Sequence, residues 1–151
     1  IQETYFACER LGVYLEGTLL KPSMTCCGAE CAEKVTPTDV AYKTIDVMLR
    51  SVPEEVAGIV FLSGGLSEEA ASIYLSEMNK TVNVTPWTVS FSYGRALQHS
   101  CLKAWAGSNI PAGQAALLAR AQANSEASRG IYVPNSQPSS DEKLFVAGYT
   151  Y

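Results

Sequence analysis

Three stretches of the chain have the hydrophobic pattern of β-strands. The stretch 58–65 opens with the continuous apolar run GIVFL, which is typical of a parallel strand buried on both faces. The stretch 87–94, WTVSFSYG, predicts a second strand. The stretch 13–21 predicts another, although Gly17 interrupts it and can mark a bulge or a close approach.

Helical patterns occupy the regions between these strands. Thr36, Pro37 and Asp39 form a helix start: an N-cap, a proline at the first helical position and an acid near the start. The helix that follows is expected to end around 51–53, and one face of it carries Val40, Thr44, Val47 and Met48. Further helices are predicted at 67–79, 95–105 and 112–128.

The order of these elements predicts an α/β fold. A strand followed by a helix, three times over, indicates parallel strands joined by right-handed helical crossovers. Residues 1–12 are typical of the last turns of a helix ended by Gly12, and no N-cap precedes them, so the chain is expected to begin inside an element. Three strands alone leave two exposed edges. We therefore expect an incomplete structure, a sector of a barrel or of a doubly wound sheet, followed by a Pro/Ser/Gly-rich tail at 129–151.

Composition narrows the class of partner. A chain of 151 residues with 47% hydrophobic content is one ordinary domain or part of a larger one. Its net charge of -4 argues against nucleic acid or an anionic membrane as a partner. We see no apolar run near the ~20 residues that a membrane span needs, and no secretion signal at the start.

The cysteines indicate a reducing, intracellular compartment. They are odd in number and follow no disulfide or zinc spacing: Cys8, Cys26, Cys27, Cys31 and Cys101. The Cys26-Cys27-Gly28 cluster suggests a metal site, but the single histidine, His99, is distant in the sequence. The alternative interpretation is a set of small buried thiols, and we expect no metal.

Candidate chemistry lies at the predicted carboxyl ends of the strands, where parallel α/β folds place their working loops. Lys21 ends the first strand. The second leads into Ser63-Gly64-Gly65, whose glycines let backbone N–H groups approach an anion near a helix N-terminus. The third leads into the turn formed by Ser92, Tyr93, Gly94 and Arg95, where a guanidinium can bind phosphate oxygens.

Each of these signals has a plainer interpretation. Lys21 can extend from the strand end into water, and a Ser-Gly-Gly turn is commonly turn chemistry alone. Arg95 opposes the helix dipole, and this unfavourable position suggests that the arginine binds something, such as an anion.

Two adjacent anion-binding turns match the phosphate site that barrels build after strands seven and eight. That places Lys21 on the sixth strand, where a desolvated lysine can attack a carbonyl and form a Schiff base.

At these residues the chain resembles the C-terminal portion of class I fructose-1,6-bisphosphate aldolase. LEGTLLKP resembles the family's Schiff-base strand, FLSGGLSEE its seventh strand and turn, and FSYGRALQ its eighth. The resemblance covers essentially the whole chain. It implies that 1–151 is the C-terminal sector of a TIM (β/α)8 barrel, with three β/α units, a C-terminal helix and a flexible tail at 130–151 that reaches the active site.

The resemblance also implies roles for single residues. Lys21 would be the Schiff-base nucleophile, and Tyr151 would exchange a proton at the enamine carbon. The phosphate of the sugar-phosphate substrate would be bound by Ser63, Gly64, Gly65, Ser92, Gly94 and Arg95. The family needs no metal or organic cofactor. Its members imply a cytoplasmic homotetramer, with an organellar location left open.

The chain departs from the family's pattern in what it does not contain. The family's general acid/base glutamate lies on an earlier strand, and Glu16 is no substitute because it sits near the wrong end of its own strand. The chain alone is therefore expected to be inactive. One alternative is a non-catalytic aldolase remnant that binds a sugar phosphate or a protein. A transaldolase-like enzyme is another, but the tail and the Ser-Gly-Gly turn do not suit it.

Overall fold

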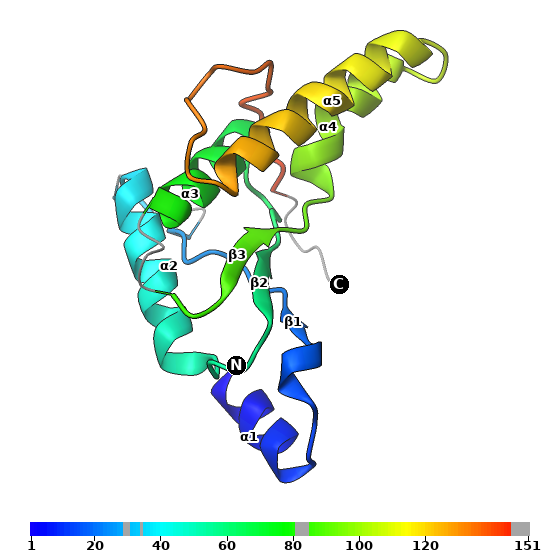
Figure 1. Ribbon diagram of the computed structural model, residues 1–151. Helices are drawn as coiled ribbons and strands as arrows, with labels where there is room; N and C mark the ends of the chain where they lie inside the picture. Colours follow the sequence, from blue (N-terminus) through cyan, green and yellow to red (C-terminus); the bar gives the residue numbers. More distant parts are fainter. Residues whose placement is uncertain (29–30, 34, 81–84, 146–151) are drawn as a thin grey trace.

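The computed structural model describes residues 1–28, 31–33, 35–80 and 85–145. Within these ranges three parallel strands form one sheet in the order β1-β2-β3 (Figure 1). The strands are β1 (Leu19–Leu20), β2 (Gly58–Phe61) and β3 (Thr88–Phe91). Gly58 of β2 pairs with Leu19 on one side and with Thr88 on the other, so β2 is the central strand.

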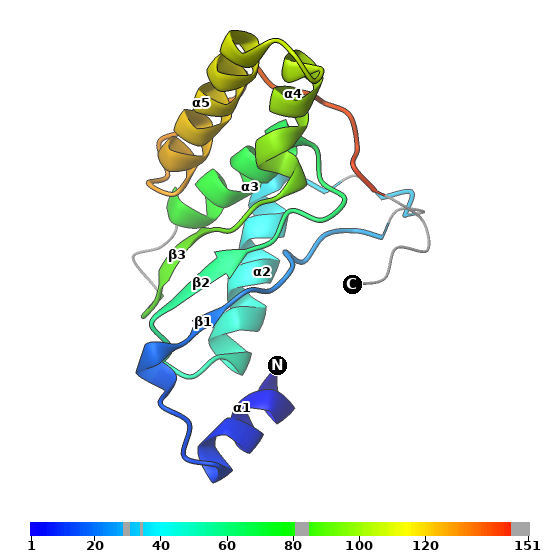
Figure 2. The same cartoon turned by 90° about the vertical axis from the view of Figure 1, so that its right-hand side faces the viewer.

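Helices α2 (Pro37–Ser51) and α3 (Glu68–Lys80) cover one face of the sheet, as Figures 1 and 2 show. Side chains alternate between the faces of a strand. Ile59, Phe61 and Val89 are buried and belong to the main hydrophobic core, whereas Val60 and Ser90 between them are only half-buried. The core therefore lies between the sheet and these two helices.

The helix boundaries follow from local capping signals. Helix α1 (Gln2–Arg10) ends in a Schellman motif, in which the Gly12 amide donates to Glu9 and the Val13 amide donates to Cys8. The positive φ of Gly12, 68°, makes this turn possible. Helix α2 begins with a capping box between Thr36 and Asp39, as the sequence predicts.

Helices α4 (Arg95–Trp105) and α5 (Ile110–Ala127) form a hairpin that extends beyond the carboxyl ends of the strands (Figure 1). The left-handed conformation of Ala106, with φ 45°, ends α4, and Asn109 caps the start of α5 by accepting a hydrogen bond from Ala112. The sequence predicted α4 at its observed bounds and α5 two residues late at its start.

The predicted strand at 13–21 is largely wrong. Only Leu19–Leu20 pairs with β2, and a 3-10 turn, η1 (Leu15–Gly17), precedes it. The turn closes because both the amide and the hydroxyl of Thr18 donate to the Leu15 carbonyl. Gly17 fits tightly against the Tyr14 ring, where a Cβ would approach a ring carbon to 2.8 Å. Gly17 thus marks a close approach, and not a bulge within a longer strand.

The cysteines are more exposed than expected, because the alternative to a metal site was a set of small buried thiols. Cys26, Cys27 and Cys31 are exposed, and Cys8 and Cys101 are half-buried, so none of the five is a buried core thiol. Among the residues that the structure describes, no group of three or more His, Cys, Asp or Glu is arranged to hold a metal. None of the helices in the described ranges is long and apolar enough to span a bilayer.

Candidate active site

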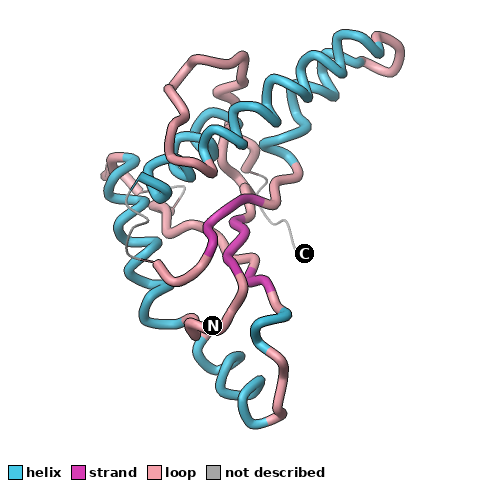
Figure 3. Tube along the Cα trace, in the orientation of Figure 1, coloured by secondary structure: helices cyan, strands magenta, loops and turns pink. Residues whose placement is uncertain are grey.

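Hydrogen bonds hold the carboxyl ends of the three strands together. The Leu62 amide donates to the Pro22 carbonyl at 3.0 Å, and the Ser92 amide donates to the Phe61 carbonyl at 2.9 Å. Pro22 directly follows Lys21. The predicted lysine and the two predicted turns therefore lie together at the carboxyl ends of the strands, where loops follow the strands (Figure 3).

Ser63 connects the turn after β2 with the turn after β3. Its side chain is buried, and its hydroxyl accepts a hydrogen bond from the Ala96 amide at 3.4 Å, in the first turn of α4. Its carbonyl accepts from the Leu66 amide at 3.1 Å. Between them, Gly65 has a φ of 84°, in the left-handed region that favours glycine, and Gly64 is exposed.

The second turn presents a helix N-terminus suited to an anion. Gly94 is the N-cap of α4, and a Cβ built on it would meet nothing within 4 Å. The first turn of α4, which the structure describes in full, contains no acidic residue. The positive end of the helix dipole favours negative charge at this position.

Tyr93 fixes this turn to the body of the molecule. Its hydroxyl donates to the Ala71 carbonyl of α3 at 3.1 Å, and its ring centroid lies 5.3 Å from that of Phe91. Burial raises the pKa of the Tyr93 hydroxyl well above its usual value. The side chain thus stays a neutral hydrogen-bond donor.

The C-terminal segment reaches both turns. Arg95, which is half-buried, donates through Nη1 to the Leu144 carbonyl at 2.5 Å. The Cβ of Phe145 lies 3.6 Å from the position that a Cβ on Gly65 would take. Tyr151, predicted to act on the enamine, lies outside the described residues.

Lys21 stands at the expected place in an environment open to solvent. It directly follows β1, and its side chain is exposed. The desolvation that activates a lysine therefore stays a prediction, as does its role as a nucleophile.

Comparison with known proteins bears directly on this arrangement. The family model for class-I fructose-bisphosphate aldolase, described as glycolytic, matches residues 1–151. The chain belongs to the class-I fructose-bisphosphate aldolase family.

Individual aldolases match nearly all of the chain. It is 52% identical over 143 residues to fructose-bisphosphate aldolase B of Gallus gallus and 51% identical over 141 residues to fructose-bisphosphate aldolase of Drosophila melanogaster. Each match covers 92% of this chain and 39% of the relative. The muscle-type enzyme of Lethenteron camtschaticum is 48% identical over 151 residues, with 42% of its length covered. The chain thus spans about two fifths of the length of these aldolases.

A solved aldolase structure supports the fold. The fructose-bisphosphate aldolase of Plasmodium falciparum, solved in complex with TRAP and a small-molecule inhibitor, matches with a TM-score of 0.85 and 45% identity. The match covers 89% of this chain and 39% of that structure. The predicted sector of an aldolase TIM barrel is therefore confirmed.

Buried polar residues that the sequence analysis did not predict lie near the candidate site. Glu68 and Glu69 in the first turn of α3 are both buried, and so are Arg120 and Asn124 of α5. The burial of Arg120 has one sign in the sequence, because its spacing places it on the same helical face as Ala123 and Ala127. The two glutamates gave no such signal, since acids are common in a first helical turn.

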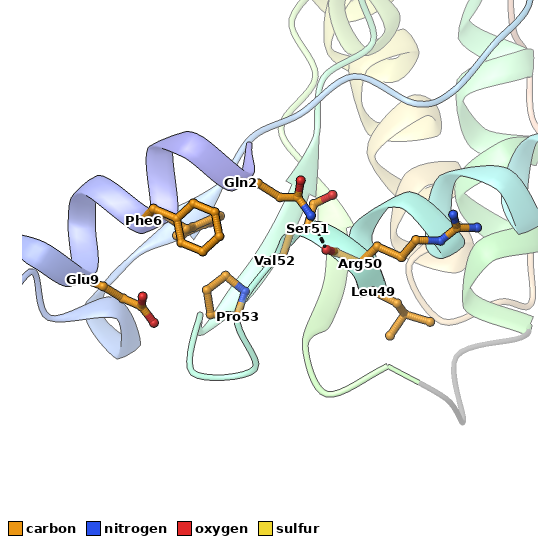
Figure 4. A pocket seen from close by; sticks show the side chains of 9 residues that line it. Gln2, Phe6, Glu9, Leu49, Arg50, Ser51, Val52 and Pro53 are labelled. Atoms are coloured by element: carbon orange, nitrogen blue, oxygen red, sulfur yellow. Dashed lines mark hydrogen bonds between the residues drawn. The ribbon is translucent and has the colours of Figure 1, made fainter.

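A cavity beside α1 lies away from the carboxyl ends of the strands. It has a volume of about 300 Å³ and lies between α1 and the end of α2 (Figure 4). Gln2 donates to the Arg50 carbonyl at its margin, at 2.9 Å. The predicted phosphate-binding residues do not line it.

Proposed function

We propose that this chain supplies the Schiff-base lysine and the phosphate-binding turns of a fructose-bisphosphate aldolase. The observation that carries the proposal is the set of hydrogen bonds joining the three strand ends, because it gathers Lys21, Ser63 and Arg95 at one edge of the sheet. The substrate is a ketose bisphosphate, and one of its phosphates would bind at Ser63, Gly64, Gly65, Ser92, Gly94 and Arg95.

The proposed reaction uses the Lys21 amine as nucleophile. Its Nζ adds to the ketone carbon of fructose 1,6-bisphosphate, and loss of water leaves a protonated imine. A base then takes the proton of the C4 hydroxyl, the C3–C4 bond breaks and its electron pair moves into the imine to form an enamine, and glyceraldehyde 3-phosphate departs as the aldehyde. Protonation of the enamine and hydrolysis of the imine release dihydroxyacetone phosphate and regenerate the amine.

Two groups needed for this reaction would come from outside the described residues. Tyr151 would assist the proton transfer to the enamine carbon. The general acid/base would be a glutamate of the part of an aldolase that this chain does not span. The exposure of Lys21 fits this view, because that remaining part would have to surround and desolvate its ammonium group. The complete protein is proposed to be a cytoplasmic homotetramer.

Borohydride trapping tests the role of Lys21 in the complete protein, in which this chain is joined to the remainder of an aldolase. With substrate present, borohydride should reduce the imine and leave a sugar phosphate on Lys21, detected by mass spectrometry. Lys21→Met keeps the side chain's bulk without a nucleophile, and Lys21→Arg cannot deprotonate at working pH. Both variants should lose trapping and cleavage while remaining folded. Full activity in either would remove Lys21 from the mechanism.

A second candidate function is a non-catalytic sugar-phosphate or protein-binding module. The exposed position of Lys21 and the partial coverage of the relatives favour it for the chain by itself. Such a module would bind a ketose bisphosphate without imine formation. If the complete protein binds the ketose bisphosphate in a calorimeter but borohydride traps no imine on Lys21, this second function would be the correct one.

A further inference from the structure

Two adjacent carboxylates are buried in the first turn of α3. Glu68 is 1% exposed and Glu69 is 5% exposed. An ionised carboxylate taken out of water is costly unless hydrogen bonds or a cation replace its hydration. The helix dipole favours acids at this position, but it acts on an exposed side chain as well. Their burial therefore needs a further reason.

The described hydrogen-bond partners of the Glu69 carboxylate come from the segment that follows α5. Its carboxylate accepts from the Tyr132 hydroxyl at 3.0 and 2.8 Å, from the Asn135 amide at 2.8 Å and from the Ser139 hydroxyl at 2.8 Å. Figure 1 shows this segment as the orange loop beside α3 and α5. A side chain of α3 thus organises a segment more than sixty residues away in the sequence.

Glu68 extends the same arrangement to α4 and to the end of that segment. Its carboxylate accepts from the Ser100 amide of α4 and from the Ser140 amide, each at 2.9 Å. The Ser100 hydroxyl donates to it as well. The segment 132–140 is therefore held at both of its ends by the two neighbouring glutamates.

A buried cation balances part of this charge. Arg120 is 0% exposed, and its Nη1 lies 3.9 Å from Oε2 of Glu69. Its Nη2 donates to the Glu68 carbonyl at 2.8 Å and to the Ser72 hydroxyl. Burial and the hydrogen bond to Glu69 raise the pKa of Tyr132, which keeps its hydroxyl a donor.

The held segment leads directly to the candidate phosphate turns. Helix α3 begins just after Ser63-Gly64-Gly65, so the glutamates are rigidly linked to the first turn. Four residues beyond Ser140, the Leu144 carbonyl accepts from Arg95, and Phe145 lies against Gly65. Between these points, Glu142 accepts from the Lys103 ammonium of α4. The glutamates thus fix where the described part of the tail begins its path to both turns.

We propose that Glu68, Glu69 and Arg120 form a tail anchor, which helps to hold residues 141–145 against the candidate phosphate turns. The three act as positioning residues through the segment 132–140. The inference deepens the proposed function and rests on it, because the tail serves turnover only if the complete protein is an aldolase.

Releasing the anchor should make the tail's described arrangement less populated. The contacts of Glu142 and Leu144 with α4 would remain, but they would then have to order the segment 132–140 as well. We expect kcat to fall, with KM nearly unchanged.

Tyr132→Phe and Glu69→Gln test the anchor in the complete protein. Both keep side-chain volume, and Glu55→Gln in the exposed loop before β2 is the matched control. Hydrogen exchange followed by mass spectrometry should show amides in 132–140 exchanging about tenfold faster, the scale of one lost hydrogen bond to a charged group. Exchange in α3 and α5 should stay unchanged, as should the control.

Several outcomes would overturn the inference. Unchanged exchange in 132–140 would remove the anchor, and faster exchange throughout α3 and α5 would make the glutamates general structural residues. An unchanged kcat with a released segment would remove the positioning role. If the unsubstituted complete protein cleaves no fructose 1,6-bisphosphate, the proposed function fails instead, and the exchange measurement still decides whether the anchor exists.

Discussion

At the scale of single residues, Arg95 joins the two parts of the candidate site. Its guanidinium donates to a neutral backbone carbonyl, that of Leu144, and its neighbour Ala96 donates to the Ser63 hydroxyl from the same first turn of α4. A phosphate offers charged acceptors in a geometry that a guanidinium can bind with two hydrogen bonds. Substrate phosphate should therefore compete with Leu144 for this side chain.

Replacement of Arg95 by alanine should weaken the binding of phosphorylated ketoses in the complete protein by about 2 kcal/mol, the usual scale of a lost charge-assisted hydrogen bond. The loss should appear in kcat/KM for fructose 1,6-bisphosphate and be much smaller for unphosphorylated fructose. Arg10→Ala, on exposed α1, is the control. Equal losses for both ketoses would make Arg95 a structural residue.

Tyr93 should limit stability in alkali. Its raised pKa means that the folded state resists losing the proton, whereas the unfolded chain ionises near the ordinary value of 10.0. Its contribution is fully present below pH 10 and is lost as the pH rises above it. In the complete protein Tyr93→Phe should flatten the alkaline fall in unfolding free energy, measured by urea titration. An identical fall in both proteins would refute this role.

The sequence predicted residues whose chemistry is local and missed those whose role depends on distant segments. Ser63 and Arg95 were predicted as site residues because strand ends and helix starts are visible in the sequence; their roles stay predictions. Glu68 and Glu69 were not, because the helix dipole already accounts for acids there, and their partners lie in 132–140 and at Ser100. Only the packing of α5 and the tail onto α3 reveals their burial.

At the scale of elements, the start of α2 allows a clean test of capping. The Thr36 hydroxyl accepts from the Asp39 amide at 3.2 Å, and the Asp39 carboxylate accepts from the Thr36 amide at 2.9 Å. Hydrogen bonds from Thr36 lower the pKa of Asp39 below its ordinary 3.8. The stabilisation from Asp39 is therefore present above pH 3.8 and lost as the pH falls below it.

Thr36→Ala should destabilise α2 by about 1 kcal/mol, the usual cost of losing an N-cap. Hydrogen exchange of the first turn of α2 in the complete protein should accelerate at neutral pH. The acceleration should shrink as the pH falls below 3.8, where the Asp39 carboxylate begins to protonate in the parent. Thr38→Ala, two residues further along the chain and exposed, is the control. Equal effects of the two substitutions would contradict the capping role.

Helices were predicted better than strands for a physical reason. The bounds of α2 and α4 follow from caps within a few residues, such as Thr36 and Gly94. The length of β1 depends on its partner strand and on the η1 turn, in which Thr18 bonds to Leu15. The hydrophobic pattern of 13–21 cannot distinguish a full strand from a turn followed by two paired residues.

At the scale of the whole molecule, the chain exposes more surface than a compact protein of its mass. Its accessible surface is 9024 Å², about a fifth above the roughly 7,450 Å² expected of a 16.2 kDa monomer. Part of the excess is apolar: Leu19 on β1 is 63% exposed and Leu118 on α5 is 69% exposed. The alternation of strands and helices predicted a barrel sector, and exposed apolar side chains of this kind are expected of one.

The last prediction concerns the isolated chain. Among the described residues, β1 and β3 each pair with one strand only, so both edges of the sheet are free to join another chain. Together with the exposed apolar side chains, these edges should cause self-association and leave the chain without aldolase activity. Sedimentation velocity at several protein concentrations should show growing oligomers.

Leu19→Lys and Leu118→Lys distinguish self-association through the sheet edges from self-association through exposed apolar side chains. A lysine at Leu19 places a charge on the open edge strand, which blocks edge pairing, whereas one at Leu118 interrupts the apolar surface of α5. If edge pairing dominates, Leu19→Lys should reduce the oligomers far more than Leu118→Lys. The complete protein should gain nothing from Leu19→Lys, because the rest of the barrel would already cover β1. A 151-residue chain that sediments as a single active monomer at every concentration would contradict both the predicted self-association and the predicted inactivity.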